Sequence, residues 1–187
     1  MNKKDTVVFD LDGTLLDTLE DLKNSVNYAM TQCGYPEHTL DEVRRYVGNG
    51  ILLLMQRAIP GGKDDPNFDK AFTLFKEHYG KHCNDTTKSY AGIMELLHTL
   101  KENNIKIAIV SNKADFAVKE LNAIYFKDLI PVAIGEKESE GIRKKPAPDT
   151  VIEALKQLGS TAENSVYIGD SDVDIETARN SGMDEIL

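Results

Sequence analysis

The sequence predicts an α/β protein with a doubly wound parallel sheet and an inserted α-helical domain, on two observations. First, apolar runs of strand length, each followed by a helical pattern, occur at residues 6–11, 105–110 and 166–168. This alternation is typical of parallel βαβ units with right-handed crossovers. Second, far more sequence separates the first two runs than one crossover requires, which indicates an insert.

The helices of the α/β part follow from periodicity and stop signals. Helical patterns lie at residues 113–124, 147–159 and 174–182. Gly159 and Gly182 end the last two of these patterns, as glycine commonly does at helix C-termini. Residues 130–135 are a fourth candidate strand.

The insert has an all-helical pattern. Residues 18–33 carry apolar side chains on one helical face, and Asp17 and Glu20 have the spacing of a capping box. Thr39 and Glu42 repeat that spacing. Further helical patterns lie at residues 51–59 and 68–79, with a loop at 60–67. We therefore expect an α/β domain of residues 1–15 and 88–187 and a helical domain of residues 16–87.

Composition and charge limit the possible partners. The 187 residues are 41% hydrophobic and 28% charged, and no stretch is long enough to span a bilayer. The net charge of -9 repels phosphate backbones and anionic lipids, so neither nucleic acid nor membrane is expected as a partner. Two cysteines without paired spacing fit reduced thiols, and the N-terminus does not have the pattern of a secretory signal. We expect a cytoplasmic protein, as a monomer or homodimer.

Polar side chains follow three of the predicted strands. In an open α/β sheet, ligands bind outside the carboxyl ends of the strands. Carboxylates that converge there repel one another unless a divalent cation, which prefers oxygen ligands, binds between them. The alternative is that these residues are helix N-caps and turn formers. The residues are Asp10 and Asp12 after the first strand, Ser111 and Asn112 after the second, and Asp170 with Asp174 after the third.

An anionic substrate would also need a cation, and Lys145 is the candidate. It precedes Pro146, which with Pro148 stiffens the chain ahead of a helix. The alternative is a solvated lysine in the charged loop of residues 136–145. We expect Lys144 and Arg143 in the same loop to be solvated surface residues.

Four short motifs carry a resemblance to a known family. The segments DLDGT (10–14), SNK (111–113), KP (145–146) and GDSDVD (169–174) resemble the four ordered motifs of the haloacid dehalogenase (HAD) superfamily of phosphotransferases. The helical insert resembles the type 1 cap domain of that superfamily. The segments VGNG (47–50), SNK and KKPAPD (144–149) are most similar to the phosphoglycolate phosphatase group.

The resemblance implies a role for each matching residue. Asp10 would be the nucleophile that forms an aspartyl-phosphate, and Asp12 the acid that protonates the leaving group and then activates water. Lys145 would balance charge beside Asp10. The metal residues would be Asp10, Asp12 through its backbone carbonyl, Asp170 and, in a supporting role, Asp174, with Mg²⁺ as the cofactor. The substrate-binding residues would be Thr14, Ser111, Asn112 and, in the cap loop, Asn49.

The implied activity is that of an Mg²⁺-dependent phosphatase for a small phosphorylated metabolite, phosphoglycolate first. Asp12 favours ester hydrolysis, because relatives that cleave carbon–halogen or carbon–phosphorus bonds lack this residue. A pyrophosphatase, a nucleotidase and a sugar phosphomutase remain alternatives on the same fold, as does a non-catalytic binding module. The cap loop around Gly48 to Gly50 covers the substrate or is simply a turn between helices.

The end of the chain departs from the family pattern. Such proteins usually continue for about one strand and one helix, whereas this sequence stops after "GMDEIL", where another strand would begin. A shortened chain is therefore expected, with lower stability at that edge of the sheet.

Overall fold

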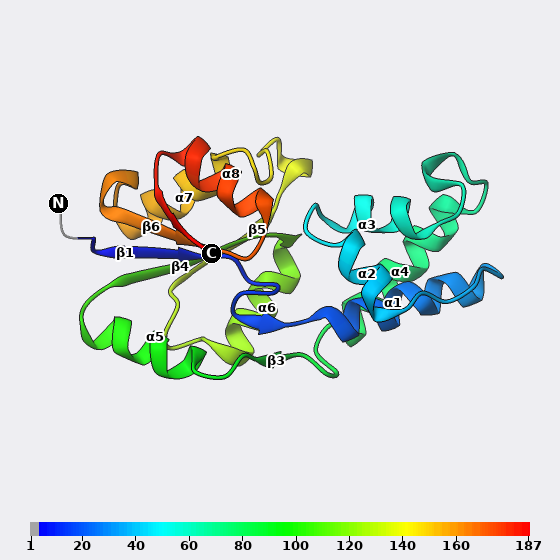
Figure 1. The fold of residues 1–187 in the computed structure, drawn as a ribbon, viewed down its shortest axis with the longest axis horizontal. Helices are drawn as coiled ribbons and strands as arrows, with labels where there is room; N and C mark the ends of the chain where they lie inside the picture. The colour runs from blue at the N-terminus through cyan, green and yellow to red at the C-terminus, as the bar shows by residue number, and fades with distance from the viewer. Residues whose placement is uncertain (1–3) are drawn as a thin grey trace. The chain divides into compact units, whose positions relative to one another are not determined.

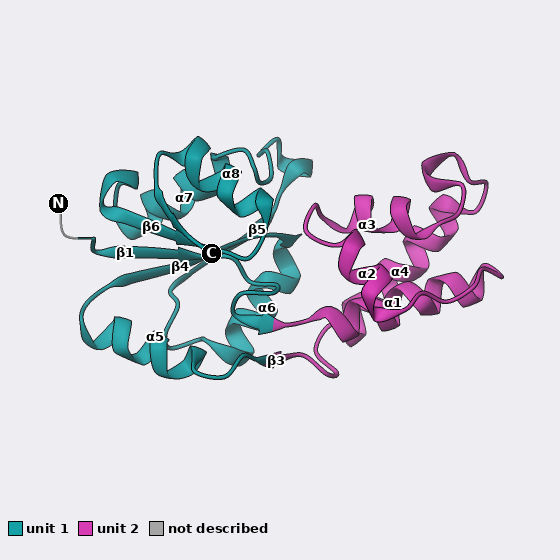
Figure 2. Ribbon diagram, in the orientation of Figure 1, with its two compact units in different colours: residues 1–16, 89–187 teal, residues 17–88 magenta. Residues whose placement is uncertain are grey.

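The computed structural model describes residues 4–187, which form two compact units (Figure 2). The core unit comprises Ser89–Leu187 together with the described residues up to Leu16, and the helical unit comprises Asp17–Lys88. The short strands β2 (Leu16–Asp17) and β3 (Lys88–Ser89) pair with each other where the chain passes between the units. Within residues 4–187, none of the helices combines the length and the apolar character needed to cross a bilayer.

A parallel five-stranded sheet forms the centre of the core unit, in the order β5-β4-β1-β6-β7 (Figure 1). The middle strand β1 (Thr6–Phe9) pairs with β4 (Lys106–Ala114) and with β6 (Ser165–Ile168). The outer strands are β5 (Val132–Glu136) and β7 (Asp184–Ile186). The predicted α/β fold class with a parallel sheet is confirmed.

Helices cover both faces of this sheet. Figure 1 shows α5 (Ile93–Glu102) and α6 (Asp115–Tyr125) on one side, and α7 (Asp149–Leu158) and α8 (Asp172–Ser181) on the other. Successive strand residues point to opposite faces. Accordingly, Phe9 of β1 is buried with residues of α5 and α6, while its neighbour Val8 is buried with residues of α7 and α8. Two 3-10 turns, η2 (Glu138–Glu140) and η3 (Ala162–Asn164), complete the unit.

The predicted helix stops are confirmed, but two elements of the core unit differ from the sequence prediction. Gly159 and Gly182 end α7 and α8 with left-handed φ values of 60° and 70°. Strand β4 continues to Ala114, past the expected end at residue 110, because pairing with β5 resumes after a register shift. Helix α5 was not predicted. It begins after Gly92 without a side-chain cap, so the usual start signal is absent from the sequence.

The helical unit contains α1 (Leu19–Gln32), α2 (Leu40–Tyr46), α3 (Ile51–Ala58), the 3-10 turn η1 (Gly62–Asp64) and α4 (Phe68–His82). The predicted capping box of Thr39 and Glu42 forms at the start of α2. The predicted box of Asp17 and Glu20 was wrong. The N-cap of α1 is Thr18, one residue later, and it makes no side-chain capping bond, while Glu20 forms an ion pair with Lys23.

A buried carboxylate ties the two ends of the helical unit together. Asp21 of α1 is 1% exposed and accepts hydrogen bonds at Oδ1 from Thr86 N (2.9 Å) and Thr86 Oγ1 (2.6 Å). Its Oδ2 accepts from Thr87 N (2.9 Å) and Thr87 Oγ1 (2.8 Å). Although burial alone would raise the pKa of Asp21, these donors hold it below its usual value.

Candidate active site

Three neighbouring strands deliver the candidate residues to one edge of the sheet. Asp10 follows β1, and its backbone N–H still donates to Ile168 O of β6 (2.8 Å). Asp170 follows β6, and Asp174 lies in the first turn of α8. Asp10, Asp170 and Asp174 each offer a carboxylate oxygen, and these oxygens lie within 4.8 Å of one another. The structure thus brings together three of the four acidic residues that the strand-end argument predicted to converge, while Asp12 lies outside this group and pairs with Lys113.

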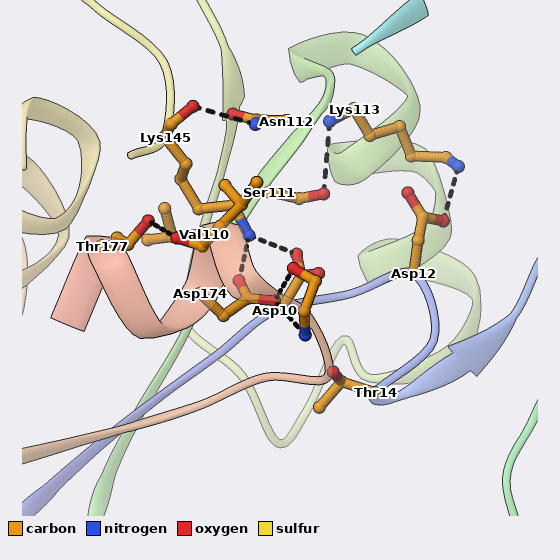
Figure 3. A network of polar contacts seen from close by, with 12 residues as sticks. Asp10, Asp12, Thr14, Val110, Ser111, Asn112, Lys113, Lys145, Asp174 and Thr177 are labelled. Carbon is orange, nitrogen blue, oxygen red and sulfur yellow. Dashed lines mark hydrogen bonds and ion pairs between the residues drawn. The ribbon is translucent and has the colours of Figure 1, made fainter. Parts of the chain in front are cut away.

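Lys145 lies inside this acidic cluster (Figure 3). Its side chain is 3% exposed, and Nζ lies 2.8 Å from Asp10 Oδ1 and 2.7 Å from Asp174 Oδ1. It also donates to the hydroxyl of Tyr167 at 3.1 Å. Two of the three N–H donors of this ammonium group have hydrogen-bond acceptors, in Tyr167 and Asp174, and the group also forms an ion pair with Asp10. Lys145 is therefore not a solvated loop lysine.

The other cations of the same loop remain at the surface. Lys144 Nζ pairs with Glu138 at 2.9 Å, and Arg143 pairs with Asp149 at 2.7 Å. The Arg143 side chain is exposed and that of Lys144 is partly exposed, in contrast to the buried Lys145.

The burial of these groups changes their proton affinities. Burial raises the pKa of Asp10 to about 7, because the nearby Lys145 ammonium only partly offsets desolvation and the charges of Asp174 and Asp12. Asp170 is exposed, but the partial loss of water around its carboxyl group, and then the Asp174 carboxylate, also raise its pKa. Although burial opposes its charge, the carboxylates of Asp10 and Asp174 raise the pKa of Lys145 well above its ordinary value. An ionised Asp10 therefore needs additional positive charge nearby.

The residues present fit a divalent cation. Four carboxyl groups, those of Asp10, Asp12, Asp170 and Asp174, face the ammonium groups of Lys145 and Lys113. When all are ionised, two negative charges remain uncompensated, and hard divalent cations prefer such oxygen ligands. The loop after β1 approaches Asp170 closely at Gly13 (φ 86°). A Cβ atom at this position would lie only 2.2 Å from Asp170 Oδ2, so a larger residue would not fit.

Asp174 supports this cluster from behind. Its Oδ1 accepts from Lys145 and from the Tyr167 hydroxyl (3.1 Å). Its Oδ2 accepts from Ser171 N (3.1 Å), Ser171 Oγ (2.5 Å) and Asp170 N (3.3 Å). A carboxylate with this many protein donors is suited to orienting its neighbours, and these bonds and Lys145 hold the pKa of Asp174 below its usual value despite burial.

The hydroxyl and amide residues of the predicted site have different partners. Thr14 Oγ1 donates to Asp170 Oδ1 at 3.4 Å, and Ser111 Oγ accepts from Lys113 N at 3.2 Å. Both lie at the ends of the central strands. Asn112 Nδ2 donates to the backbone carbonyl of Lys145 at 3.1 Å, so its amide holds the main chain that carries the lysine. Contacts of these three residues with a substrate stay predictions.

Asn49 lies in the helical unit, in the turn between α2 and α3. Gly48 and Gly50 flank it with φ values of 102° and 87°, which favour glycine. Asn49 Oδ1 accepts from Arg57 Nη2 at 2.9 Å, and Arg57 also donates to Tyr46 O at 2.8 Å. These bonds brace the turn. Its contact with a substrate also stays a prediction.

Sequence reasoning missed two residues of the site. Lys113, within the quoted SNK motif, was given no role, yet its Nζ lies 2.7 Å from Asp12 Oδ1. Tyr167 was counted only as a strand residue, and its hydroxyl contacts both Lys145 and Asp174. The one available signal was a polar or amphipathic residue at the end of a buried strand, which does not identify its partner.

The fold and site together define a doubly wound α/β protein with an acidic cluster, suited to holding a metal ion, at the ends of its central strands. The family model described as haloacid dehalogenase-like hydrolase matches residues 7–187. The chain therefore belongs to this family, which confirms the resemblance noted in its four motifs.

Relatives and solved structures agree with this membership. The chain is 31% identical over 183 residues to a phosphoglycolate phosphatase of Pseudomonas putida, covering 95% of this chain and 66% of that protein. It is 32% identical over 185 residues to a phosphoglycolate phosphatase of Aquifex aeolicus, covering 97% of this chain and 83% of that protein. A predicted phosphoglycolate phosphatase from Haemophilus somnus, 27% identical, has a TM-score of 0.88 over 99% of this chain and 85% of its own.

Proposed function

We propose that this protein is an Mg²⁺-dependent phosphatase that hydrolyses a small phosphate monoester through an aspartyl-phosphate on Asp10, with phosphoglycolate as the first candidate substrate. The observation that carries the proposal is the buried Asp10 carboxylate at the end of β1, 2.8 Å from the Lys145 ammonium and with carboxylate oxygens of Asp170 and Asp174 within 4.8 Å. The names of the relatives support the choice of phosphoglycolate.

In the first step an Asp10 oxygen attacks phosphorus, and a bond between that oxygen and phosphorus forms as the bond to the substrate's alcohol oxygen breaks. Asp12 gives its proton to the departing oxygen. Lys145 balances the charge beside Asp10, and Thr14 and Ser111 donate hydrogen bonds to phosphoryl oxygens. Mg²⁺, bound by Asp10, Asp170 and the backbone carbonyl of Asp12, would supply positive charge to the phosphoryl group.

In the second step water attacks the same phosphorus. Asp12, now a carboxylate, takes a proton from that water as the bond between phosphorus and the Asp10 oxygen breaks. Inorganic phosphate is released, and both aspartates return to their starting states. This exchange of acid and base roles requires that the Asp12 side chain stay beside the reacting oxygen in both steps.

The test is phosphate release from a panel of phosphate esters, measured on EDTA-treated protein with and without added Mg²⁺. The panel contains phosphoglycolate, other small phosphomonoesters, nucleoside monophosphates, a sugar phosphate and pyrophosphate. We expect phosphoglycolate to give the highest kcat/KM. A higher value for pyrophosphate or for a nucleotide would select the corresponding alternative, and conversion of the sugar phosphate to an isomer would indicate a mutase.

A nucleophile variant tests the covalent step. Asp10→Asn should abolish turnover on every ester and prevent formation of a phosphoenzyme detectable by mass spectrometry, because the amide cannot replace the attacking carboxylate. The exposed Asp128→Asn in the same unit is the matched control and should retain full activity. A phosphoenzyme in the Asp10 variant would contradict the proposal.

A further inference from the structure

Lys113 is a buried cation that the two steps above leave without a role. It lies near the end of β4, and its side chain is only 2% exposed. Its Nζ donates to Asp12 Oδ1 at 2.7 Å, while the Asp12 side chain is 28% exposed (Figure 3). A fixed, buried ammonium thus reaches a carboxylate at the surface of the site.

Burial of a lysine is costly unless its charge is paired. Taking an ammonium group out of water costs several kcal/mol even after relaxation. A methionine side chain could occupy the same buried position without that cost. The ion pair with the Asp12 carboxylate is therefore the feature that distinguishes a lysine from a methionine at this position.

An irregularity in the backbone of β4 accounts for the direction of the Lys113 side chain. The register with β5 shifts between Val110 and Ala114, and such bulges redirect side chains at sheet edges beside active sites. Within this irregular segment Ser111 Oγ accepts from Lys113 N, and Asn112 reaches the main chain of Lys145. The segment connects the strand end both to the Asp12 loop and to the Lys145 loop.

We propose that Lys113 is a positioning residue that holds the Asp12 side chain in the orientation needed for proton transfer. The inference rests on the proposed function, in which Asp12 acts in both steps. A partly exposed aspartate has several staggered rotamers available, and the ion pair with a buried ammonium favours one of them. The two lysines then have separate tasks: Lys145 serves Asp10 and Asp174, and Lys113 serves Asp12.

The first arm of the test compares leaving groups. Lys113→Met keeps the buried stem and removes the ammonium. We expect it to slow enzyme phosphorylation by phosphoglycolate about tenfold or more, since misplacement of a catalytic group by 1 Å can cost roughly 10²-fold. Phosphorylation by p-nitrophenyl phosphate, whose leaving group hardly needs a proton, should change little when the burst is measured by rapid mixing.

Two further variants separate positioning from folding. Lys119→Met removes an exposed lysine, paired with Asp115 at 2.6 Å, from the neighbouring helix α6 and should leave both rates unchanged. Lys113→Arg retains a cation and should recover part of the phosphoglycolate rate that Lys113→Met loses. Equal losses on both substrates, without recovery by arginine, would overturn the inference.

A double-mutant cycle with Asp12→Asn decides whether Lys113 acts through Asp12. Because residues that work as one unit are not additive, adding Lys113→Met to Asp12→Asn should slow phosphorylation by phosphoglycolate no further. Additive losses would show that Lys113 binds substrate directly or only supports the fold, and would overturn the inference. If Asp12→Asn strongly slows phosphorylation by phosphoglycolate and Lys113→Met does not, the inference about Lys113 is overturned while the proposed role of Asp12 stands. No effect of Asp12→Asn would overturn the proposed role of Asp12 and the inference with it.

Discussion

The Lys145 ammonium is shared almost equally between two carboxylates, at 2.8 Å from Asp10 and 2.7 Å from Asp174. This sharing has a chemical consequence. A lysine paired with Asp10 alone would neutralise this carboxylate, whereas one that also pairs with Asp174 offsets only part of the negative charge on Asp10. The hydroxyl of Tyr167 fixes the ammonium in this shared position. The carboxylate that we propose as the nucleophile is thus held in place by an ammonium that it shares with Asp174.

At the same scale, measurements of Mg²⁺ binding can separate the metal roles that we propose for Asp170 and Asp174. Asp170→Asn should weaken Mg²⁺ binding to the metal-free protein more than Asp174→Asn, because Asp174 already accepts hydrogen bonds at both oxygens. The loss for Asp174→Asn should be about 10 to 100-fold, as for other residues that orient ligands. Titration calorimetry measures both without any substrate.

The exposed Asp172 lies between these two residues and makes a matched control, since Asp172→Asn removes the same charge at the start of α8. Its effect on Mg²⁺ affinity should be small. A larger loss for Asp174→Asn than for Asp170→Asn would contradict the assignment of Asp170 as the ligand.

At the scale of elements, local signals predicted much of the fold. The helix stops at Gly159 and Gly182 and the box at Thr39 depend on neighbours within a few residues, so they can be read from the sequence. The continuation of β4 to Ala114 depends on pairing with β5 after a register shift. Polar residues 111–113 end the apolar run, so the sequence contains no sign of that pairing.

The candidate site likewise has residues that the sequence predicts and residues that it does not. The convergence of Asp10, Asp170 and Asp174 was predictable because residues at the ends of parallel strands share one edge of the sheet. The pairs made by Lys113 and Tyr167 were not predictable. Lys113 meets Asp12 across 101 positions of the chain, and Tyr167 meets Lys145 across 22. Only the assembled sheet selects these partners.

The hydrogen bonds of Asp21 in α1 to Thr86 and Thr87, here called the clamp, yield a prediction for the helical unit. Asp21→Asn should lower its free energy of unfolding at pH 7 by about 2–3 kcal/mol, because the four threonine donors lose a charged acceptor. The folded-state pKa of Asp21 is lowered, so this stabilisation is complete above the unfolded value near 3.9 and is lost as the pH falls through the folded value.

Chemical denaturation at pH 7 and at pH 3 would measure this difference between the wild type and Asp21→Asn. The gap should shrink at the lower pH. Asp64→Asn, an exposed carboxylate of η1 in the same unit, should show almost no gap at either pH. A gap that is equal at both pH values would mean that the clamp does not depend on the charge of Asp21.

At the scale of the whole molecule, the distribution of buried apolar side chains bears on how the chain unfolds. The helical unit has its own hydrophobic cluster, built from α1 to α4, with Phe75 fully buried in it. The core unit has one cluster on each face of its sheet, and Phe126 is buried in the cluster beneath α5 and α6. Regions with separate cores commonly open as separate cooperative units.

We therefore expect Phe75→Ala and Phe126→Ala to destabilise different parts of the chain. Each substitution removes a fully buried ring, which typically costs about 3–5 kcal/mol. Native-state hydrogen exchange should show faster opening of residues 17–88 in Phe75→Ala and of the sheet strands in Phe126→Ala. Because the carboxylates of the site all belong to the core unit, Phe75→Ala should retain Mg²⁺ affinity, which serves as the internal control. If Phe75→Ala instead accelerates exchange in β1, β4 and β6 as much as in α1 and α4, the two units unfold as one.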